Sequence, residues 1–240
     1  MAEPTFRIVE VIYEGMTQLD FTAPHTVFSR IPNSETIVAS KSGGAVTSDG
    51  GLTFAGTRAM ADIDRCDLLF FPGGLAATEV INDAAFMTEA KRLASGARYL
   101  TSVCTGSLIL AATGALKGRR AACHWAWRDM LTLFGAIPDP ARVARDGDII
   151  TGGGVTAGID FALTVAAELA GDDFAQALQL NLEYAPSPPF NAGRPEIAPP
   201  EILARVRKNM EGIMPKRLAQ AQAAAARLSA PPLGELSRSD

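Results

Sequence analysis

The stretch "YLTSVCTGSL", from Tyr99 to Leu108, decides how the rest of the chain is arranged. It begins as a short apolar run typical of a buried strand, and after Cys104 it continues with Thr, Gly and the spacing of a helix. A sharp strand-to-helix turn displays its side chain above the sheet, beside the backbone N–H groups of the new helix. The stretch therefore predicts a nucleophilic thiol at Cys104, with a pKa that the N–H of Thr105 helps to lower.

The surrounding sequence alternates between strand-like and helix-like segments. Apolar and β-branched runs predict strands at 6–13, 35–42, 67–71 and 98–103. Helical spacing occurs at 22–31, 84–97, from after Cys104 to 115, at 125–135, at 156–170, and from Asp172 as a cap towards Tyr184. Hairpins are predicted from 46–47 with 52–54, and across Asp146-Gly147 in "RVARDGDIITGGG". Strands that are apolar throughout indicate a mostly parallel sheet covered on both faces, so the fold class is α/β, a doubly wound, flavodoxin-like sandwich.

Length and composition favour one globular domain. The chain has 240 residues, 48% of them hydrophobic, and no repeat or linker divides it. We expect residues 1–198 to form an α/β domain. Residues 199–240, rich in Ala, Arg and Gln, should form a helical extension with a polar tail, either part of the same domain or a contact in a dimer.

Charge and cysteine content exclude several classes of partner. The net charge is −4, without blocks of like charge, which argues against nucleic acid or an anionic membrane as a partner. The first residues show no signal peptide, and no apolar run is long enough to cross a bilayer, so a cytoplasmic location is expected. Three cysteines without C-x-x-C spacing suggest neither disulfides nor a zinc site.

Chemically useful residues follow the predicted strands at the edge where their carboxyl ends meet. The first strand leads to Asp20, and the strand at 67–71 leads to Gly73 and Gly74. Paired glycines let backbone N–H groups approach a substrate, which suits an oxyanion pocket near the sulfur, although a simple turn explains them equally well. A desolvated carboxyl at Asp20 could stay protonated next to the Cys104 thiol and act as general acid and base.

The remaining candidates have structural interpretations of similar weight. His124 is the only plausible base besides Asp20, and it either reaches the thiol or is a structural histidine beside a tryptophan. His25 is more consistent with a structural role, and Cys66 and Cys123 are predicted to be core residues. The run Gly152–Gly154 is either part of the site or a tight entry to a helix.

At these residues the chain resembles the ThiJ/PfpI superfamily, whose members share the fold of class I glutamine amidotransferases, and within it the isocyanide hydratases. The matching stretches cover nearly the whole chain before the last helix: "QLDFTAPHTVF", "PGG", "ARYLTSVCTGSLILAATGALKGRRA", "HWAW", "GAIP", "RVARDGDIITGGGVTAGIDFAL" and "LNLEYAPSPPFNAG". The cysteine turn and the glycine pair are common to the superfamily. Asp20 stands where many members have Glu, and Ala23 stands where glycine is commoner before Pro24. AraC-type regulators share much of the pattern but add a helix-turn-helix module of roughly a hundred residues, for which we expect this chain to be too short.

The resemblance implies a homodimer that hydrates an isocyanide to an N-substituted formamide with no metal or organic cofactor. It implies Cys104 as the nucleophile that forms a thioimidate, Asp20 as the catalytic carboxylate and Thr105 beside them. Gly153 and Val155 are implied on the substrate side, at the start of a helix along the active site. For a neutral, slender substrate we expect a pocket with few charges and no arginine clamp.

Two other functions share the same sulfur. A cysteine-dependent hydrolase or deglycase needs His124 as its base. A non-catalytic redox sensor needs only a thiol that oxidises to a stable sulfinate.

Overall fold

A computed structural model of the chain describes residues 6–229. Its main sheet has eight strands in the order β3-β4-β2-β1-β5-β6-β10-β9. The strands are β1 (Phe6–Val11), β2 (Ser34–Ser40), β3 (Gly44–Thr47), β4 (Thr53–Ala59), β5 (Leu68–Phe71), β6 (Tyr99–Val103), β9 (Val143–Asp146) and β10 (Ile149–Gly152). Pairing is parallel from β4 to β10, and the edge strands β3 and β9 pair antiparallel with β4 and β10. The predicted α/β class and both predicted hairpins are confirmed.

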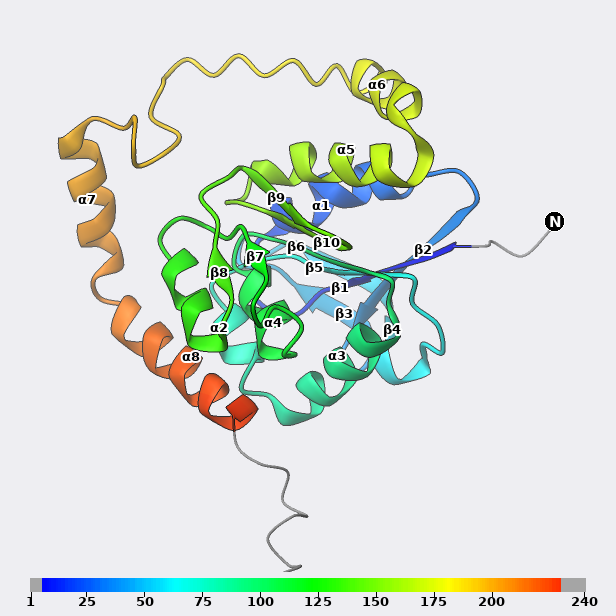
Figure 1. The fold of residues 1–240 in the computed structure, drawn as a ribbon, viewed down its shortest axis with the longest axis horizontal. Coiled ribbons are helices and arrows are strands. Elements are labelled where there is room, and N and C mark those ends of the chain that lie inside the picture. The colour runs from blue at the N-terminus through cyan, green and yellow to red at the C-terminus, as the bar shows by residue number, and fades with distance from the viewer. Residues whose placement is uncertain (1–5, 230–240) are drawn as a thin grey trace, which may run out of the picture.

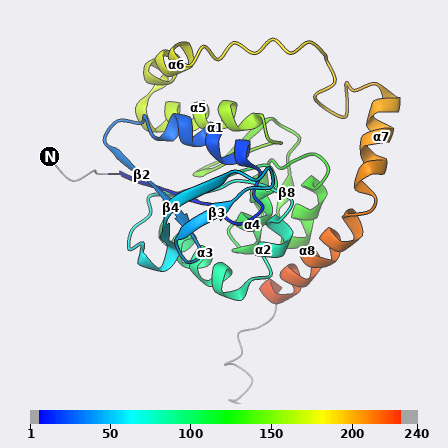
Figure 2. The ribbon, with the colours of Figure 1, turned by 180° about the vertical axis from the view of Figure 1, so that it is seen from behind.

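Helices cover both faces of this sheet (Figures 1 and 2). On one face lie α1 (Gln18–Phe28) and α5 (Ala157–Ala170), with α6 (Asp172–Asn181) outside them. The other face carries α2 (Ala77–Val80), α3 (Ala84–Gly96), α4 (Gly106–Ala112), the 3-10 helix η2 (Arg128–Phe134) and α8 (Met214–Ser229). The remaining elements are η1 (Met60–Asp62), a small parallel pair of β7 (Arg120–Ala121) and β8 (Ile137–Pro138), and α7 (Pro200–Met210).

Each face of the sheet buries its own apolar core. On the α1 and α5 face, the rings of Phe28, Phe70 and Phe161 pack together in a triangle, with centroids 5.6 to 5.9 Å apart. On the opposite face, α4 is buried along its whole length. Because both faces are covered, the central strands are apolar on both sides, which is why their sequence shows no alternation.

The first helix starts earlier than the sequence pattern predicts, and this matters for the site. It begins at Gln18 rather than near residue 22, so Asp20 lies in its first turn and not in a loop. The misleading signal is Pro24, which is normally found in the first turn of a helix because it lacks an N–H group. Here Pro24 lies inside α1 and packs on the other helix of this face, where its Cδ would be 3.2 Å from a Cβ built on Gly158.

Three further differences concern helix type and ends. The segment at 125–135 forms a short 3-10 helix, the tighter form that short helical pieces between turns often take. Asp172 is the first helical residue of α6 and does not cap it, since Gly171 is the cap and no side-chain cap bond forms. The C-terminal segment is split into α7 and α8, because Pro215 fits only the first turn of a new helix.

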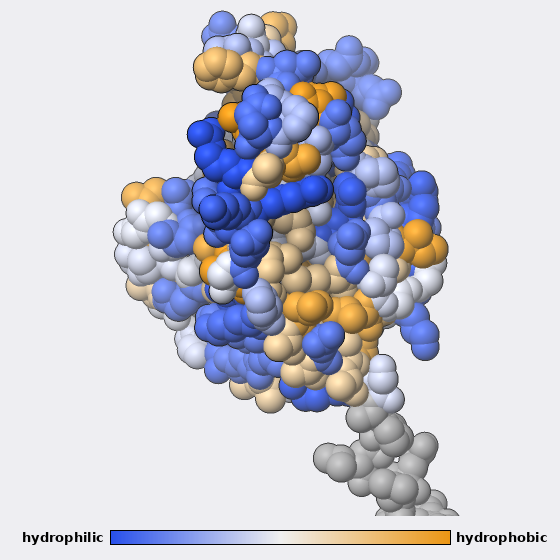
Figure 3. Space-filling model, turned by 90° about the vertical axis from the view of Figure 1, so that its left-hand side faces the viewer, coloured by the Kyte–Doolittle hydropathy of each residue, from blue (hydrophilic) through white to orange (hydrophobic). Residues whose placement is uncertain are grey.

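The final helix packs on the body of the same chain. Ala221, Ala224 and Ala225 of α8 are buried against α2, α4 and η2, whereas α7 buries no residue. Figure 3 shows the face that carries α7 and α8, on which a hydrophobic patch near the end of α8 interrupts a largely hydrophilic surface. The predicted polar tail lies outside the described residues. Within 6–229, no helix combines the length and apolar character that crossing a membrane requires.

Candidate active site

Cys104 lies at the sharp turn between β6 and α4. Its backbone is left-handed, with φ of 56°, a conformation that non-glycine residues adopt only where the surroundings enforce it. Its N–H donates to the carbonyls of Gly152 and Gly153 at 3.1 and 2.8 Å, so the end of β10 fixes the turn. The predicted strand–cysteine–helix turn is present, and only 5% of the residue is exposed.

The turn brings α4 close to the end of β5. A Cβ atom built on Gly106 would lie 2.2 Å from the carbonyl oxygen of Phe71, so no larger residue fits there without backbone movement. This contact explains the glycine two positions after the cysteine. It also places the first N–H groups of α4 next to the Pro72–Gly74 turn.

Asp20 is buried beside the thiol. None of its surface is exposed, and neither carboxylate oxygen has a well-aligned hydrogen bond within the described residues. Burial raises its pKa from 3.8 to about 7, a shift that the nearby Cys104 thiol and the Gly73 N–H partly offset. A carboxyl with a pKa near neutrality can both donate and accept a proton under physiological conditions.

Gly73 is the point around which the site is assembled. A Cβ atom built on Gly73 would lie 2.6 Å from the Cβ of Cys104, 2.7 Å from the Thr105 nitrogen and 2.8 Å from Oδ2 of Asp20. The structure thus brings together residues that the sequence places on three separate segments. A small reacting group next to the sulfur would meet both the carboxyl and backbone N–H groups.

The thiol pKa of Cys104 is raised well above its usual value, although the predicted lowering contribution of the Thr105 N–H is present. Burial is the main cause, and the charges of Asp20 and Cys123 add to it. The N–H groups of Val155 and Thr105 act in the expected lowering direction but are outweighed. The thiol and the Asp20 carboxyl therefore hold protons as a coupled pair, and removing the first proton from the pair leaves the second strongly bound.

The Thr105 hydroxyl connects the cysteine turn to the glycine pair. It donates to the carbonyl of Gly74 and accepts from the N–H of Gly74, both at 2.8 Å. The Gly74 N–H is therefore engaged with Thr105, and Gly74 supports the site by holding that residue. The N–H of Gly153 is likewise engaged, with the carbonyl of Arg142 at 2.8 Å, so the free donors nearest the sulfur are those of Thr105 and Val155.

His124 lies near the site without contacting the thiol. Its ring stacks on Trp125 with centroids 5.7 Å apart, and its Nδ1 accepts from the N–H of Ala126 at 3.2 Å. Burial lowers its pKa to about 4, so the ring is neutral at neutral pH. This environment matches the structural interpretation better than a base for Cys104.

Tyr13 is a supporting residue that the sequence pattern did not indicate. Its hydroxyl donates to the carbonyl of Pro72 at 3.0 Å and its side chain is buried. Its pKa is raised well above 10 by burial and by the charges of Asp20 and Cys104, which shows that it belongs to the same buried cluster. The sequence signal for such a role is its position as the last residue of the predicted first strand, at the edge of the sheet where Asp20 was also predicted.

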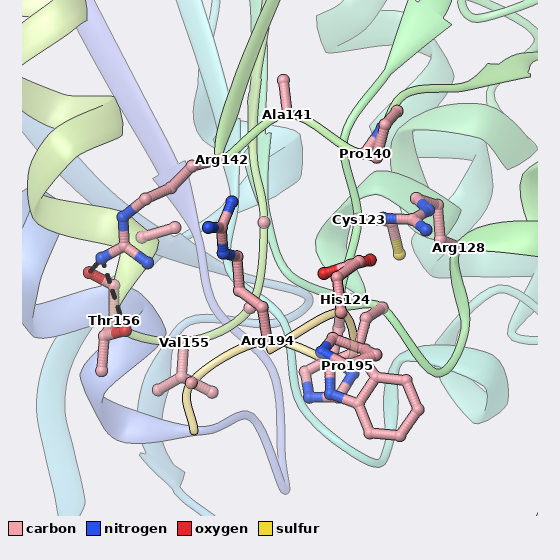
Figure 4. Close-up of a pocket in the computed structure, with 16 residues that line it drawn as sticks. Cys123, His124, Arg128, Pro140, Ala141, Arg142, Val155, Thr156, Arg194 and Pro195 are labelled. Carbon is pink, nitrogen blue, oxygen red and sulfur yellow. Dashed lines mark hydrogen bonds between the residues drawn. The ribbon is translucent and has the colours of Figure 1, made fainter. Parts of the chain in front are cut away.

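A pocket of about 210 Å³ opens beside these residues. Cys123, Gly153 and Val155 form its inner wall, and the side chains that line it include Arg128, Arg142 and Arg194 (Figure 4). This neighbouring pocket thus contains charged side chains, whereas the substrate pocket was expected to have few. These arginines come from three separate segments, and nothing in the local sequence indicates that they meet.

The other cysteines are buried residues, as predicted. Cys66 and Cys123 are buried and free, and burial raises the pKa of each to about 12. Within residues 6–229, no group of three or more His, Cys, Asp or Glu side chains is placed to hold a metal ion.

Comparison with known proteins gives relatives that agree with one another in fold and family. The isonitrile hydratase of Pseudomonas putida is 43% identical over 91% of this chain and 96% of its own length. The crystal structure of a ThiJ/PfpI family protein from Pseudomonas syringae matches with a TM-score of 0.84 at 41% identity, covering 92% of this chain and 90% of that one. Drosophila melanogaster DJ-1beta has the same fold, with a TM-score of 0.67 at 22% identity over 75% of this chain and 99% of its own. Residues 6–168 match the model of the DJ-1/PfpI family, and the chain belongs to this family.

Proposed function

We propose that this protein is an isocyanide hydratase, which adds water to R–N≡C to give an N-substituted formamide. The observation that carries the proposal is the buried pair of Cys104 and Asp20, which meet at Gly73. The similarity to an isonitrile hydratase, isonitrile being another word for isocyanide, supports the same chemistry. The terminal carbon of an isocyanide needs a nucleophile and a proton at one atom, and this pair supplies both.

In the first step the sulfur of Cys104 bonds to the terminal isocyanide carbon. The proton shared by the pair is delivered by Asp20 to the lone pair of that carbon. The product is a thioimidate, R–N=CH–S–Cys104, and Asp20 is left as a carboxylate. Because the Asp20 carboxyl and the Cys104 thiol lie within hydrogen-bonding reach of each other, both can act on the same substrate carbon.

In the second step water adds to the thioimidate carbon. The Asp20 carboxylate takes a proton from the water and passes the same proton to the nitrogen, so that the tetrahedral adduct R–NH–CH(OH)–S–Cys104 forms and Asp20 is again a carboxylate. The adduct collapses with formation of C=O and cleavage of the C–S bond, and the hydroxyl proton returns to the pair. The released formamide, R–NH–CHO, leaves the enzyme with its starting number of protons.

Backbone donors complete the site. The N–H groups of Thr105 and Val155 face the sulfur and favour negative charge on it during attack and release. The Thr105 hydroxyl fixes this arrangement through its two bonds to Gly74. We assign Thr105 a positioning role.

The test is formamide production from an aryl isocyanide, followed by absorbance. Wild type should turn over, Cys104→Ser should lose activity entirely, and Asp20→Asn should lose about 10²–10⁴-fold, the usual contribution of general acid–base catalysis. Cys66→Ser is the matched control and should retain activity, because Cys66 is a buried free thiol before the start of β5, whereas Gly73 follows the end of that strand. Lack of turnover by wild type on aryl and alkyl isocyanides would overturn the proposal.

A trapping experiment tests the covalent step independently. Enzyme quenched during turnover should carry the substrate mass on the peptide that contains Cys104. Active enzyme without this adduct would contradict the thioimidate route.

We also propose that the protein acts as a homodimer in the cytoplasm. Large apolar side chains support an interface, since Leu180 and Phe190 are 82% and 81% exposed. Phe190 lies on the segment between α6 and α7, which arches away from the body (Figure 1). The free thiols suit a reducing compartment. Light scattering should give twice the chain mass, and a monomer would refute the dimer.

The last part of the chain is proposed to belong to the same domain as residues 1–198. The buried alanines of α8 and the ion pairs of Lys216 and Arg217 with Glu79, at 3.1 and 2.9 Å, support this assignment. Replacing Ala224 with Glu buries an unpaired carboxylate and should lower the thermal midpoint. An unchanged midpoint would show that α8 folds separately.

A further inference from the structure

The pocket beside Cys104 contains arginines that have no acidic partner. Neither Arg128 nor Arg194 forms an ion pair or a side-chain hydrogen bond with any described residue. Arg142 differs, because its Nε lies 2.7 Å from Oδ2 of Asp160 and its charge is thereby compensated. In Figure 4, Arg194 lies between Arg142 and Arg128 across the pocket.

The remaining lining groups do not cancel this positive charge. Glu196 also lines the pocket but is exposed and forms no ion pair within the described part of the chain. His124 is neutral at neutral pH because burial lowers its pKa to about 4. Two uncompensated guanidinium groups facing one carboxylate leave the pocket with net positive charge. Such a pocket favours an anionic ligand.

Two residues that line the pocket also contact Cys104. The inner wall of the pocket includes Gly153, whose carbonyl accepts from the Cys104 N–H at 2.8 Å, and Val155, whose N–H acts on the thiol. Arg128 lies beside Cys123 on the same wall, where its charge acts on that thiol. The same pocket is therefore lined both by residues that contact Cys104 and by the arginines.

We propose that Arg128 and Arg194 bind a carboxylate on the substrate and that the enzyme prefers isocyanides that carry one. This inference rests on the proposed hydratase function and names its substrate class. Guanidinium groups suit a carboxylate because their planar N–H donors match its two oxygens. The volume of about 210 Å³ is below the ~300–1,000 Å³ of drug-sized sites, which favours a short aliphatic substrate.

The test compares 3-isocyanopropanoate with its methyl ester, which has the same reactive group and nearly the same length. Wild type should show kcat/KM at least about tenfold higher for the carboxylate, the contribution of one charge-assisted hydrogen bond. Arg128→Gln and Arg194→Gln should each reduce this ratio about tenfold. Arg58→Gln, an exposed arginine on β4 outside the pocket, is the matched control and should keep the wild-type ratio.

The outcomes separate this inference from the function on which it rests. Turnover of the ester equal to or faster than that of the carboxylate would overturn the anion preference and leave the hydratase function intact. A ratio unchanged in both arginine variants would likewise overturn the assignment of Arg128 and Arg194. Turnover of neither compound by enzyme that hydrates an aryl isocyanide would also overturn the anion preference, whereas lack of turnover on the aryl isocyanide as well would overturn the function.

Product binding tests the anion preference without turnover. Calorimetry should show that N-formyl-β-alanine binds about tenfold more tightly than its methyl ester, and that Arg194→Gln removes the difference. Raising the salt concentration should weaken binding of the acid and leave that of the ester unchanged. Equal binding of acid and ester would overturn the inference whatever the catalytic result.

Discussion

The Cα of Gly73 faces the Cβ of Cys104 so closely that a Cβ atom on Gly73 would lie 2.6 Å from it. The same position would be 2.8 Å from the Asp20 carboxylate. Contacts this short leave no room for a side chain at this position unless its neighbours move. The absence of a side chain on Gly73 therefore lets the Cys104 and Asp20 side chains keep their places next to each other.

Gly73→Ala is therefore expected to inactivate the enzyme while the fold persists. The methyl group displaces the sulfur or the carboxyl, and a misplacement of about 1 Å can cost roughly 10²-fold in rate. Steady-state turnover measures the effect, with circular dichroism to verify the fold. Gly96→Ala at the end of α3 is the control, since its added Cβ meets nothing within 4 Å. Activity of Gly73→Ala within a few-fold of wild type would place the reaction elsewhere.

The pH dependence of kcat/KM should report the protonation of the Cys104 and Asp20 pair. Below the pKa of Asp20, about 7, both groups are protonated and no thiolate forms, so kcat/KM should rise with pH through about 7. The measurement is initial rate from pH 5 to 9. His25 also has a raised pKa, so His25→Gln serves as the control and must retain the rise. Loss of the rise in that variant would assign it to histidine.

Replacing Asp20 with Asn should stabilise the protein at high pH. The folded-state pKa is raised above the unfolded value, so the favourable contribution is present below 3.8 and lost as pH rises through about 7. A rise from 3.8 to about 7 corresponds to roughly 4 kcal/mol, an upper limit because the proton is shared with Cys104. Denaturant unfolding at pH 8 and pH 4 should show a gain at pH 8 that shrinks at pH 4. Equal effects at both values would contradict the buried charge.

The buried Glu10 of β1 depends on His25 of α1. Oε2 of Glu10 lies 2.5 Å from Nδ1 of His25, and Oε1 has no partner within the described residues. Their hydrogen bond raises the pKa of His25, although Arg30 acts in the opposite direction. His25→Ala leaves a buried acceptor unpaired and should cost about 1–3 kcal/mol in unfolding free energy.

The pH dependence and a double variant test this pair. Because the pKa of His25 is raised above 6.5, its contribution is complete below 6.5 and lost as pH rises through the folded value. The loss in His25→Ala should therefore be larger at pH 6 than at pH 9. Replacing both residues with Leu should recover much of the stability. No recovery would show that the two side chains act separately.

Peroxide distinguishes catalysis from redox sensing at Cys104. A thiol with a raised pKa and 5% exposure holds little thiolate at pH 7, so oxidation should be slower than for a free thiol. Mass analysis of the Cys104 peptide after graded peroxide measures this. Quantitative sulfinate at low peroxide would favour the sensor function.

The sequence predicted the parts of the site that depend on local geometry. Cys104 and the glycines were found because a strand-to-helix turn and a close backbone approach restrict the residues that fit. The sequence also predicted Asp20 as a partner of Cys104 but placed it in a loop, because a proline such as Pro24 usually lies in the first turn of a helix. The central strands of the sheet were predicted from runs that are apolar throughout, because burial on both faces removes the alternation of apolar and polar residues.

Properties that depend on many distant segments were not predicted. The thiol pKa of Cys104 is set by total burial and by Asp20, which no local pattern reveals. The arginines line one pocket only because η2, the loop after β8 and the segment after α6 come together around it. Tyr13 was missed for the same reason, since its role is defined by its contact with Pro72.

The order of the central strands has a consequence for how activity appears during folding. Asp20, Gly73, Cys104 and Val155 follow β1, β5, β6 and β10, which are neighbours in the sheet but far apart in the chain. Pairing strands that are far apart in the chain costs the entropy of closing long loops before the favourable contacts form, so this pairing is slow. No partial structure that lacks β10 can hold the turn at Cys104, whose N–H bonds to Gly152 and Gly153. Regain of turnover after dilution from denaturant should therefore lag behind helix formation and report the last step of sheet closure.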